Sequence, residues 1–192
     1  MKKLLLAAFV LASAAFSAKA QQGSVLVYGS LGLQTQSANY VNLRNVDGES
    51  GKGTCFSIAP GVGYQFNKNW TAGLELGFSS NKSGDAKAEN LFNVGPFVRY
   101  SQPISDIFSI YGQAGVGFES YKQDQSKASG VYVSVVPAIS ANIKNGFALN
   151  FGFGGLSFEN TKVKDGDAGS SFGVNFGKSF NIGVSKNFGG KK

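Results

Sequence analysis

Few residues of this chain could carry out acid–base or nucleophilic chemistry. Its 192 residues include no histidine, so the most common general base and metal ligand is missing, and only one cysteine, Cys55. A serine hydroxyl without a base to take its proton is a poor nucleophile. We therefore expect no catalytic residue, no metal site and no cofactor, and we do not predict an enzyme.

Two short motifs suggest ligand binding but lack what such binding requires. The glycines of Gly61-Val62-Gly63 do not open a helix, as a nucleotide-binding loop would. Asp165 and Asp167 have too few oxygen ligands near them in the sequence for a calcium site. We interpret these motifs as small residues in a barrel wall and a solvated turn.

Glu75 and Arg99 are the charged residues most in need of a partner. Both are expected on the polar face of neighbouring strands, which faces the lumen of the barrel predicted below. A charge that faces such a confined lumen normally requires an opposite charge. We predict that they form an ion pair in the lumen, and the alternative is that each contacts only water. Four other residues are expected to complete this polar network, namely Asn93, Tyr111, Gln113 and Asn150.

Strands must position these side chains, because apolar residues alternate strictly with small or polar ones. Within residues 54–66, Phe56, Ile58 and Val62 fall on one face, and serine, alanine and glycine fall on the other. No helical apolar period follows residue 20. Eight strands are predicted, near 24–35, 54–66, 69–79, 91–101, 107–120, 130–143, 147–158 and 172–188.

The connections between these strands alternate in length. The short ones lie near 67–69, 102–106 and 144–146, and the long polar ones near 37–53, 80–90, 121–129 and 159–170. This alternation is typical of a transmembrane barrel with short periplasmic turns and longer extracellular loops. We therefore predict an all-β fold, an eight-stranded antiparallel up-and-down barrel. Pro60, Pro96 and Pro137 each remove a ladder donor, so local bulges or water are expected there.

The two faces differ in the solvent that they suit. The polar face is rich in glycine, serine and asparagine, which fit a crowded barrel interior, and the apolar face is almost free of charge. A soluble periplasmic ligand-binding barrel would instead need a charged outer surface, and is the less favoured alternative. An interfacial aromatic girdle is expected beside the short turns, formed by Phe66, Trp70, Tyr100, Phe108, Phe147 and Phe188. Lys178 and Lys186 fall on the same face and are expected at its outer and inner rims.

Residues 1–20 have the three regions of an export signal. A positively charged start precedes an apolar run at 4–17, and Ala18-Lys19-Ala20 forms a small-x-small cleavage site. The run is shorter than the roughly 18 to 20 residues of a spanning helix. We expect cleavage after Ala20, which leaves 21–192 as one barrel domain. Its basic residues are dispersed and include only two arginines, so nucleic acid is not an expected partner.

Several segments carry a family resemblance. These are Gln21-Gln22 after the export signal, the strands FSIAPGVGYQF and FNVGPFVRY, and the last strand ending in phenylalanine. The chain resembles the small outer-membrane β-barrel family, porin-like and of the OmpX/OmpW type, that is common in Bacteroidetes. The resemblance implies location in the cell outer membrane and folding by the barrel-assembly machinery. Asn181, Gly183 and Phe188 are similar to the C-terminal signal that this machinery reads, although Lys186 takes a hydrophobic place in it and residues 189–192 extend past it.

The expected function follows from this architecture. We predict a monomeric barrel with a structural or surface-interaction role through its extracellular loops. The alternative is a narrow porin-like channel for ions or small solutes, because inward glycines leave room in the lumen. Tyr40, Leu43 and Arg44 are the expected contact residues of the longest loop. Outer-membrane lipid and lipopolysaccharide are expected partners, the latter through Lys52, Lys82, Lys87, Lys122, Lys127, Lys162 and Lys164; the alternative for these lysines is a solvated loop surface.

Overall fold

The computed structural model describes residues 23–36, 52–84, 86–164 and 166–189. The predicted leader with Ala18 and Ala20, and the loop residues Tyr40, Leu43 and Arg44, lie outside this range. The described part contains eight strands: β1 (Ser24–Gln36), β2 (Gly53–Gln65), β3 (Trp70–Ser83), β4 (Glu89–Pro103), β5 (Phe108–Gln123), β6 (Ser126–Lys144), β7 (Phe147–Val163) and β8 (Ala168–Phe188). No helix in the described segments is long and apolar enough to cross a membrane.

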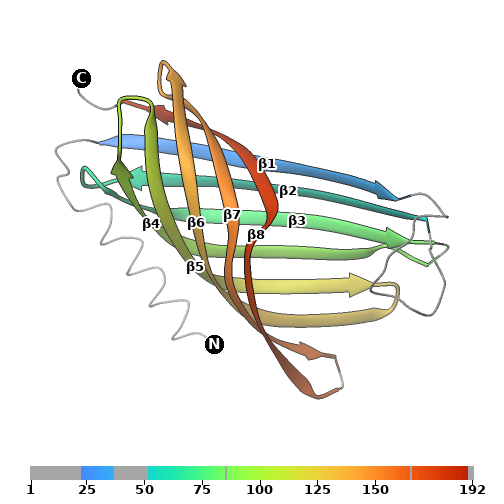
Figure 1. The fold of residues 1–192 in the computed structure, drawn as a ribbon. Coiled ribbons are helices and arrows are strands. Elements are labelled where there is room, and N and C mark those ends of the chain that lie inside the picture. Colours follow the sequence, from blue (N-terminus) through green and yellow to red (C-terminus); the bar gives the residue numbers. More distant parts are fainter. Residues whose placement is uncertain (1–22, 37–51, 85, 165, 190–192) are drawn as a thin grey trace, which may run out of the picture.

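Each strand pairs antiparallel with the next, and β8 returns to pair with β1 (Figure 1). The predicted eight-stranded up-and-down barrel is therefore confirmed. We call the end where β1 begins and β8 finishes the terminal end, and the opposite end the far end. The connections β2–β3, β4–β5 and β6–β7 lie at the terminal end.

The seam between β1 and β8 is short. It comprises six residue pairs, from Val25↔Phe188 to Ser30↔Gly183, whereas β1 pairs with β2 along its whole length. In Figure 1 the two strands lie together near the terminal end and diverge towards the far end. The terminal half of the barrel is thus closed by backbone pairing on every side.

The strands extend further than their sequence pattern indicates. β3 reaches Ser83, β5 reaches Gln123 and β7 reaches Val163, so most of the segments expected as long loops at 80–90, 121–129 and 159–170 are strand. Backbone pairing continues beyond the apolar band, where both faces are solvated and the alternation that marks a strand disappears. At the terminal end, the predicted turn at Asn145-Gly146 is present, with φ of 54° and 78° as a type I′ turn requires.

The three prolines do not behave alike. The β6–β7 register shifts between Val135 and Ala138, so Pro137 lies in the expected irregularity. Around Pro60 and Pro96 the register continues unshifted, with only gaps in the β2–β3 and β4–β5 ladders. Of the two expected alternatives, a bulge is therefore absent at Pro60 and Pro96, because a missing donor leaves a gap in the ladder without requiring an extra residue.

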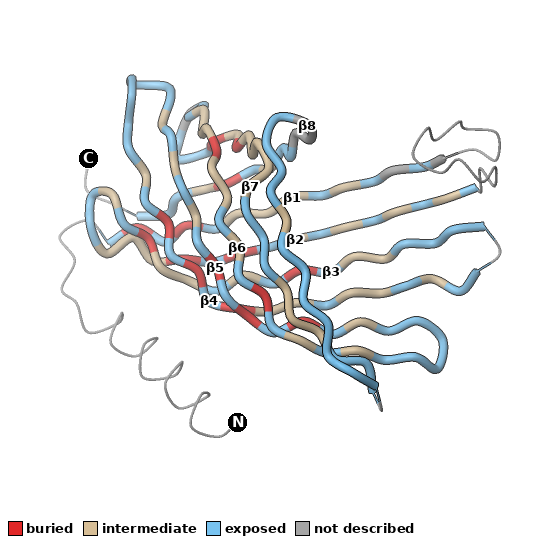
Figure 2. The backbone as a smooth tube through the Cα atoms, turned by 60° about the horizontal axis from the view of Figure 1, so that its bottom comes forward, coloured by how far each residue is buried: buried red, intermediate tan, exposed pale blue. Residues whose placement is uncertain are grey.

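The apolar side chains face outward. Leu74, Val116 and Val174 are each at least half exposed, and no described side chain is less than 2% exposed. The few buried residues gather mainly in the terminal half of the barrel (Figure 2). This is the reverse of a soluble barrel, whose apolar residues would fill its interior.

Aromatic residues form two tiers on the outer face. The six residues of the predicted girdle lie at or near strand ends at the terminal end, where Trp70 and Tyr100 pair directly with ring centroids 5.0 Å apart. A second tier lies nearer the far end and includes the cross-strand pairs Phe78↔Phe92 and Phe158↔Phe172. Aromatic girdles at both interfaces are a property of transmembrane barrels.

Candidate functional site: a polar plug across the lumen

Glu75 and Arg99 are joined through one amide. The guanidinium of Arg99 donates from Nε and Nη2 to Gln113 Oε1 at 2.9 and 2.6 Å, and Gln113 Nε2 donates to Glu75 Oε2 at 2.7 Å. Glu75 and Arg99 do not form the expected direct ion pair. In the part of the chain described here, the one ion pair joins Lys87 and Asp124. The register explains this: Glu75 lies opposite Gly95, four residues along β4 from Arg99, whereas Gln113 lies opposite Arg99 itself.

Tyr28, which the sequence analysis did not single out, completes the connection. Its hydroxyl donates to Glu75 Oε2 at 2.5 Å and accepts a bond from Gln113 Nε2 at 3.0 Å. The Arg99 guanidinium carbon lies 4.6 Å from the Tyr28 ring centroid and 4.2 Å from that of Tyr111, as in cation–π contacts. Phe97 packs edge-on against Tyr28 at 5.5 Å between centroids. We call these six residues (Tyr28, Glu75, Phe97, Arg99, Tyr111 and Gln113) the plug.

Inward glycines make room for the plug. A Cβ atom at Gly61 would lie 2.3 Å from Tyr28 Cζ, and one at Gly63 would lie 2.9 Å from Phe97 Cζ. Both separations are far below van der Waals contact. At these positions the glycines admit large side chains into the lumen instead of widening a passage through it.

The structure places the other two predicted network residues apart from the plug. Asn93 lies towards the far end, where a Cβ on Gly77 would meet its Oδ1 at 2.3 Å. Asn150 lies towards the terminal end and donates from Nδ2 to Ser185 Oγ at 2.9 Å. Its Oδ1 is buried and has no hydrogen-bond partner.

Between the plug and the terminal end is a cavity of about 190 Å³, which we call the terminal cavity. Arg99 and Tyr111 of the plug contribute to its wall, and Lys68 lies in the β2–β3 turn at its mouth. All eight strands contribute to it, with Leu26, Gln65, Thr71, Ser101, Pro103, Ser109, Ser140, Asn142, Ala148, Asn150, Ser185 and Asn187 as the other lining residues.

On the far side of the plug, two carboxylates approach one hydroxyl. Tyr121 Oη lies 3.4 Å from both Glu119 Oε2 and Glu159 Oε2, and its single proton can serve only one of them. Glu119 is 5% exposed, and its Oε1 has no hydrogen-bond partner. The described residues hold no cluster of three or more His, Cys, Asp or Glu that suits a metal ion.

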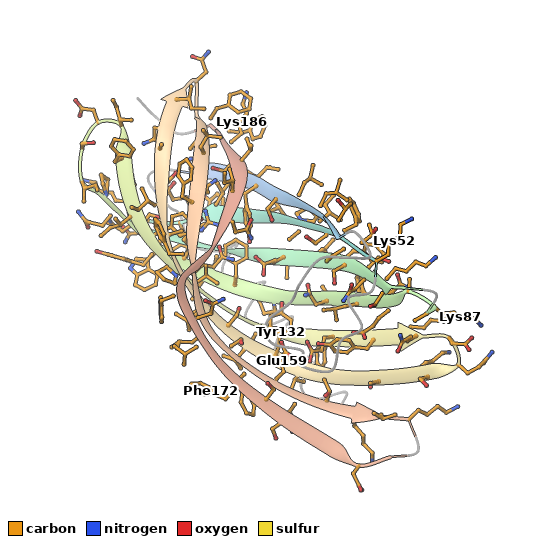
Figure 3. All side chains as sticks on the ribbon, turned by 45° about the vertical axis from the view of Figure 1, so that its right-hand side comes forward. Lys52, Lys87, Tyr132, Glu159, Phe172 and Lys186 are labelled. Carbon is orange, nitrogen blue, oxygen red and sulfur yellow. The ribbon has the colours of Figure 1, made fainter. Side chains whose placement is uncertain are left out.

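Lysines flank the two aromatic tiers. At the far end, Lys122 lies directly opposite Lys127, and the Lys164 amide donates to the Lys127 carbonyl at 2.8 Å. At the terminal end, the Lys186 ammonium lies 4.1 and 5.1 Å from the ring centroids of Phe147 and Phe188. Figure 3 shows Lys186 at one end of the barrel and Lys52 and Lys87 at the other. The Lys178 side chain lies outside the described part of the structure.

Comparison with known proteins agrees with this architecture. The model of the outer membrane protein beta-barrel domain family matches residues 4–188. The chain belongs to this family. It is therefore an outer-membrane β-barrel protein. A search of curated proteins finds no match.

Two solved barrels share the fold at low sequence identity. Neisserial surface protein A is 14% identical, with a TM-score of 0.51 over 86% of this chain and 97% of that one. OprG from Pseudomonas aeruginosa is 11% identical, with a TM-score of 0.52 over 88% of this chain and 98% of that one. At these identities the likeness concerns the fold alone.

Proposed function

We propose that this outer-membrane barrel is a non-catalytic, monomeric protein whose lumen is blocked by the plug, and that it has a structural or surface-interaction role. The plug carries the proposal. Its six side chains come from β1, β3, β4 and β5 and are connected by hydrogen bonds and ring contacts across the lumen. Small eight-stranded barrels are generally filled by side chains in this way.

The second candidate function is a narrow channel. It is favoured by the polar lining on both sides of the plug, because the terminal cavity approaches from one end and the Glu119–Tyr121–Glu159 group lies towards the other. A passage would require the Gln113 amide to leave its bonds with Glu75 and Arg99.

Planar-bilayer recordings separate these two functions. A closed barrel is expected to give no steady conductance, and Tyr28→Ala with Gln113→Ala, which removes two plug side chains, is expected to open one. The exposed-turn substitution Gln125→Ala is the matched control. Steady wild-type currents that change in Glu75→Gln and Arg99→Gln would replace the proposal with the channel.

We propose that lipopolysaccharide phosphates contact the lysines of the far end. Lys82, Lys122, Lys127 and Lys162 are exposed there, at ladder positions beyond the second aromatic tier, where anionic headgroups meet the barrel. Lys122 and Lys127 are unfavourable neighbours without an anion, since like charges directly opposite each other destabilise a sheet.

Thermal unfolding tests this contact. Lys122→Gln with Lys127→Gln is expected to lower the melting temperature in vesicles containing lipopolysaccharide and to leave it unchanged or raised in phosphatidylcholine. The same response in both lipids would contradict the proposed contact.

We also propose that the barrel-assembly machinery reads the end of β8. Residues Gly183 to Lys186 of this strand pair with both β7 and β1, and Asn187 and Phe188 pair with β1, so the segment that carries the assembly signal is also the one that closes the barrel.

A further inference from the structure

We propose that the terminal cavity is a binding site for a small oxyanion, a carboxylate or phosphate that also carries a hydroxyl or amino group. The proposal is independent of whether the lumen conducts. It rests on the charge, the hydrogen-bonding groups and the size of the cavity.

The charged residues that line the cavity are all cationic. Its described lining contains two cationic residues, Arg99 and Lys68, and no acidic one. Glu75, which balances Arg99 in the plug, lies on the other side of the Gln113 amide and does not line the cavity. An anion in the cavity would therefore meet positive charge at its floor and at its mouth, without a competing carboxylate in the wall.

Arg99 is held ready for such a ligand. It is 5% exposed, and the rings of Tyr28 and Tyr111 both contact the guanidinium. Its bonds to Gln113 use Nε and Nη2, which leaves Nη1 outside that interaction. A guanidinium fixed in this way binds an oxyanion without first losing side-chain freedom.

The rest of the wall supplies neutral polar groups. Ten of the fifteen lining residues are uncharged and polar, with hydroxyls or amides from seven strands. The buried Oδ1 of Asn150 lacks a donor, whereas Asn150 Nδ2 is already bound to Ser185. A ligand hydroxyl or amino group would satisfy this acceptor, and for that reason a hydroxy acid or hydrogen phosphate fits better than a simple halide.

The size of the cavity restricts the ligand to a small molecule. A volume of about 190 Å³ lies below the 300 to 1,000 Å³ that is typical of drug-sized ligand pockets. The mouth opens at the terminal end, which faces the periplasm in barrels of this topology. The ligand would therefore be a periplasmic solute.

Nuclear magnetic resonance of the full mature protein in lipid nanodiscs tests the site. Inorganic phosphate and lactate are titrated separately at constant ionic strength. Saturable shifts are expected at the amides of Thr71, Ser140 and Asn150 with at least one of the two anions, and none with chloride.

Three variants locate the binding. Lys68→Gln, in an exposed turn, is expected to weaken binding up to about fivefold, as the loss of an exposed ion pair does. Asn150→Asp places a carboxylate in the wall and is expected to weaken binding at least about tenfold. Lys127→Gln, at the far end, is the matched control and is expected to bind as the wild type does. Absence of saturable shifts with both anions, equal weakening in Lys68→Gln and Lys127→Gln, or unchanged binding in both cavity variants would overturn the proposal.

Discussion

Gln113 is the residue on which the plug depends most, because its amide serves both charged groups. The carboxamide oxygen accepts from Arg99, and the nitrogen donates to Glu75 and to Tyr28. An amide suits this position since it is at once a donor and an acceptor. Without it, a buried guanidinium would lose its acceptor and the carboxylate would lose one of its donors.

Gln113→Leu is therefore expected to lower the free energy of unfolding by about 2 to 4 kcal/mol, since removing one partner leaves buried charges uncompensated. Urea unfolding from vesicles, followed by the fluorescence of Trp70, measures this. Gln125→Leu makes the same chemical change in an exposed turn and is expected to have little effect. An equal loss in the two variants would mean that the bridge contributes nothing.

Glu119 is the opposite case, a charged residue whose surroundings do not satisfy it. Its Oε1 is buried without a donor, and Glu159 competes for the Tyr121 proton. Glu119→Gln removes the like-charge repulsion and is expected to stabilise the barrel by about 1 kcal/mol at neutral pH. Glu89→Gln, at the exposed start of β4, serves as the control in the same urea assay. A less stable Glu119→Gln protein would indicate that the charge itself is needed there.

At the residue scale, the sequence predicts which face of the strand a side chain lies on better than it predicts the position of that side chain along the barrel axis. Alternation places Glu75, Arg99 and Gln113 in the lumen, and the structure brings them together. It does not reveal that Glu75 and Arg99 are offset by four residues along β4. Tyr28 was missed because its place in the plug depends on the β1–β2 register, which sets it opposite Gly61. An inward aromatic facing a glycine is the signal that would identify such a residue.

At the scale of elements, the β1–β8 seam is the part of the barrel with the fewest pairs. Every other neighbouring pair of strands shares at least eleven residue pairs, against six at the seam. An unpaired backbone group in hydrocarbon costs several kcal/mol, so those six pairs are what makes the terminal half a closed cylinder.

A disulfide tests this closure. Gly29 and Val184 are partners across the seam, and a Cβ at Gly29 would meet no atom closer than 3.6 Å. In a Cys55→Ser background, Gly29→Cys with Val184→Cys is expected to cross-link on oxidation, as a faster band on a non-reducing gel. Leu33→Cys with Phe176→Cys, which lie beyond the seam towards the far end, is expected to remain reduced. Efficient cross-linking of the second pair alone would place the seam elsewhere.

The limits of the strands were harder to predict than their number. The turn at Asn145-Gly146 was predictable because only a few residue types tolerate its positive φ values. The parts of β3, β5 and β7 nearest the far end were not predictable, since polar residues on both faces remove the alternation. Their backbone pairing depends on neighbouring strands that are distant in sequence.

At the scale of the whole molecule, the distance between the aromatic tiers indicates the thickness of the apolar layer that the barrel spans. Trp70 and Phe78 lie eight residues apart on β3, or roughly 26 Å of strand at about 3.3 Å per residue. A strand tilt of about 40° reduces this to roughly 20 Å, comparable with the apolar band of about 25 Å in outer-membrane barrels. The two tiers therefore mark the two interfaces, and the side chains midway between them lie in hydrocarbon.

Leu74 occupies that midpoint, four residues from each tier, with 52% of its surface exposed on the outer face. Leu74→Lys is expected to destabilise the folded barrel by about 2 to 4 kcal/mol in phosphatidylcholine vesicles, the cost of a lysine at the bilayer midplane. Ser80→Lys lies on the same face of the same strand but beyond Phe78, and a lysine near the interface costs only about 0 to 1 kcal/mol. Urea unfolding measures both, and heat-modifiable gel migration checks that each variant is folded. If the two lysines cost the same, the outer face between the tiers does not meet hydrocarbon, because hydrocarbon penalises a lysine at the midplane more than one near the interface.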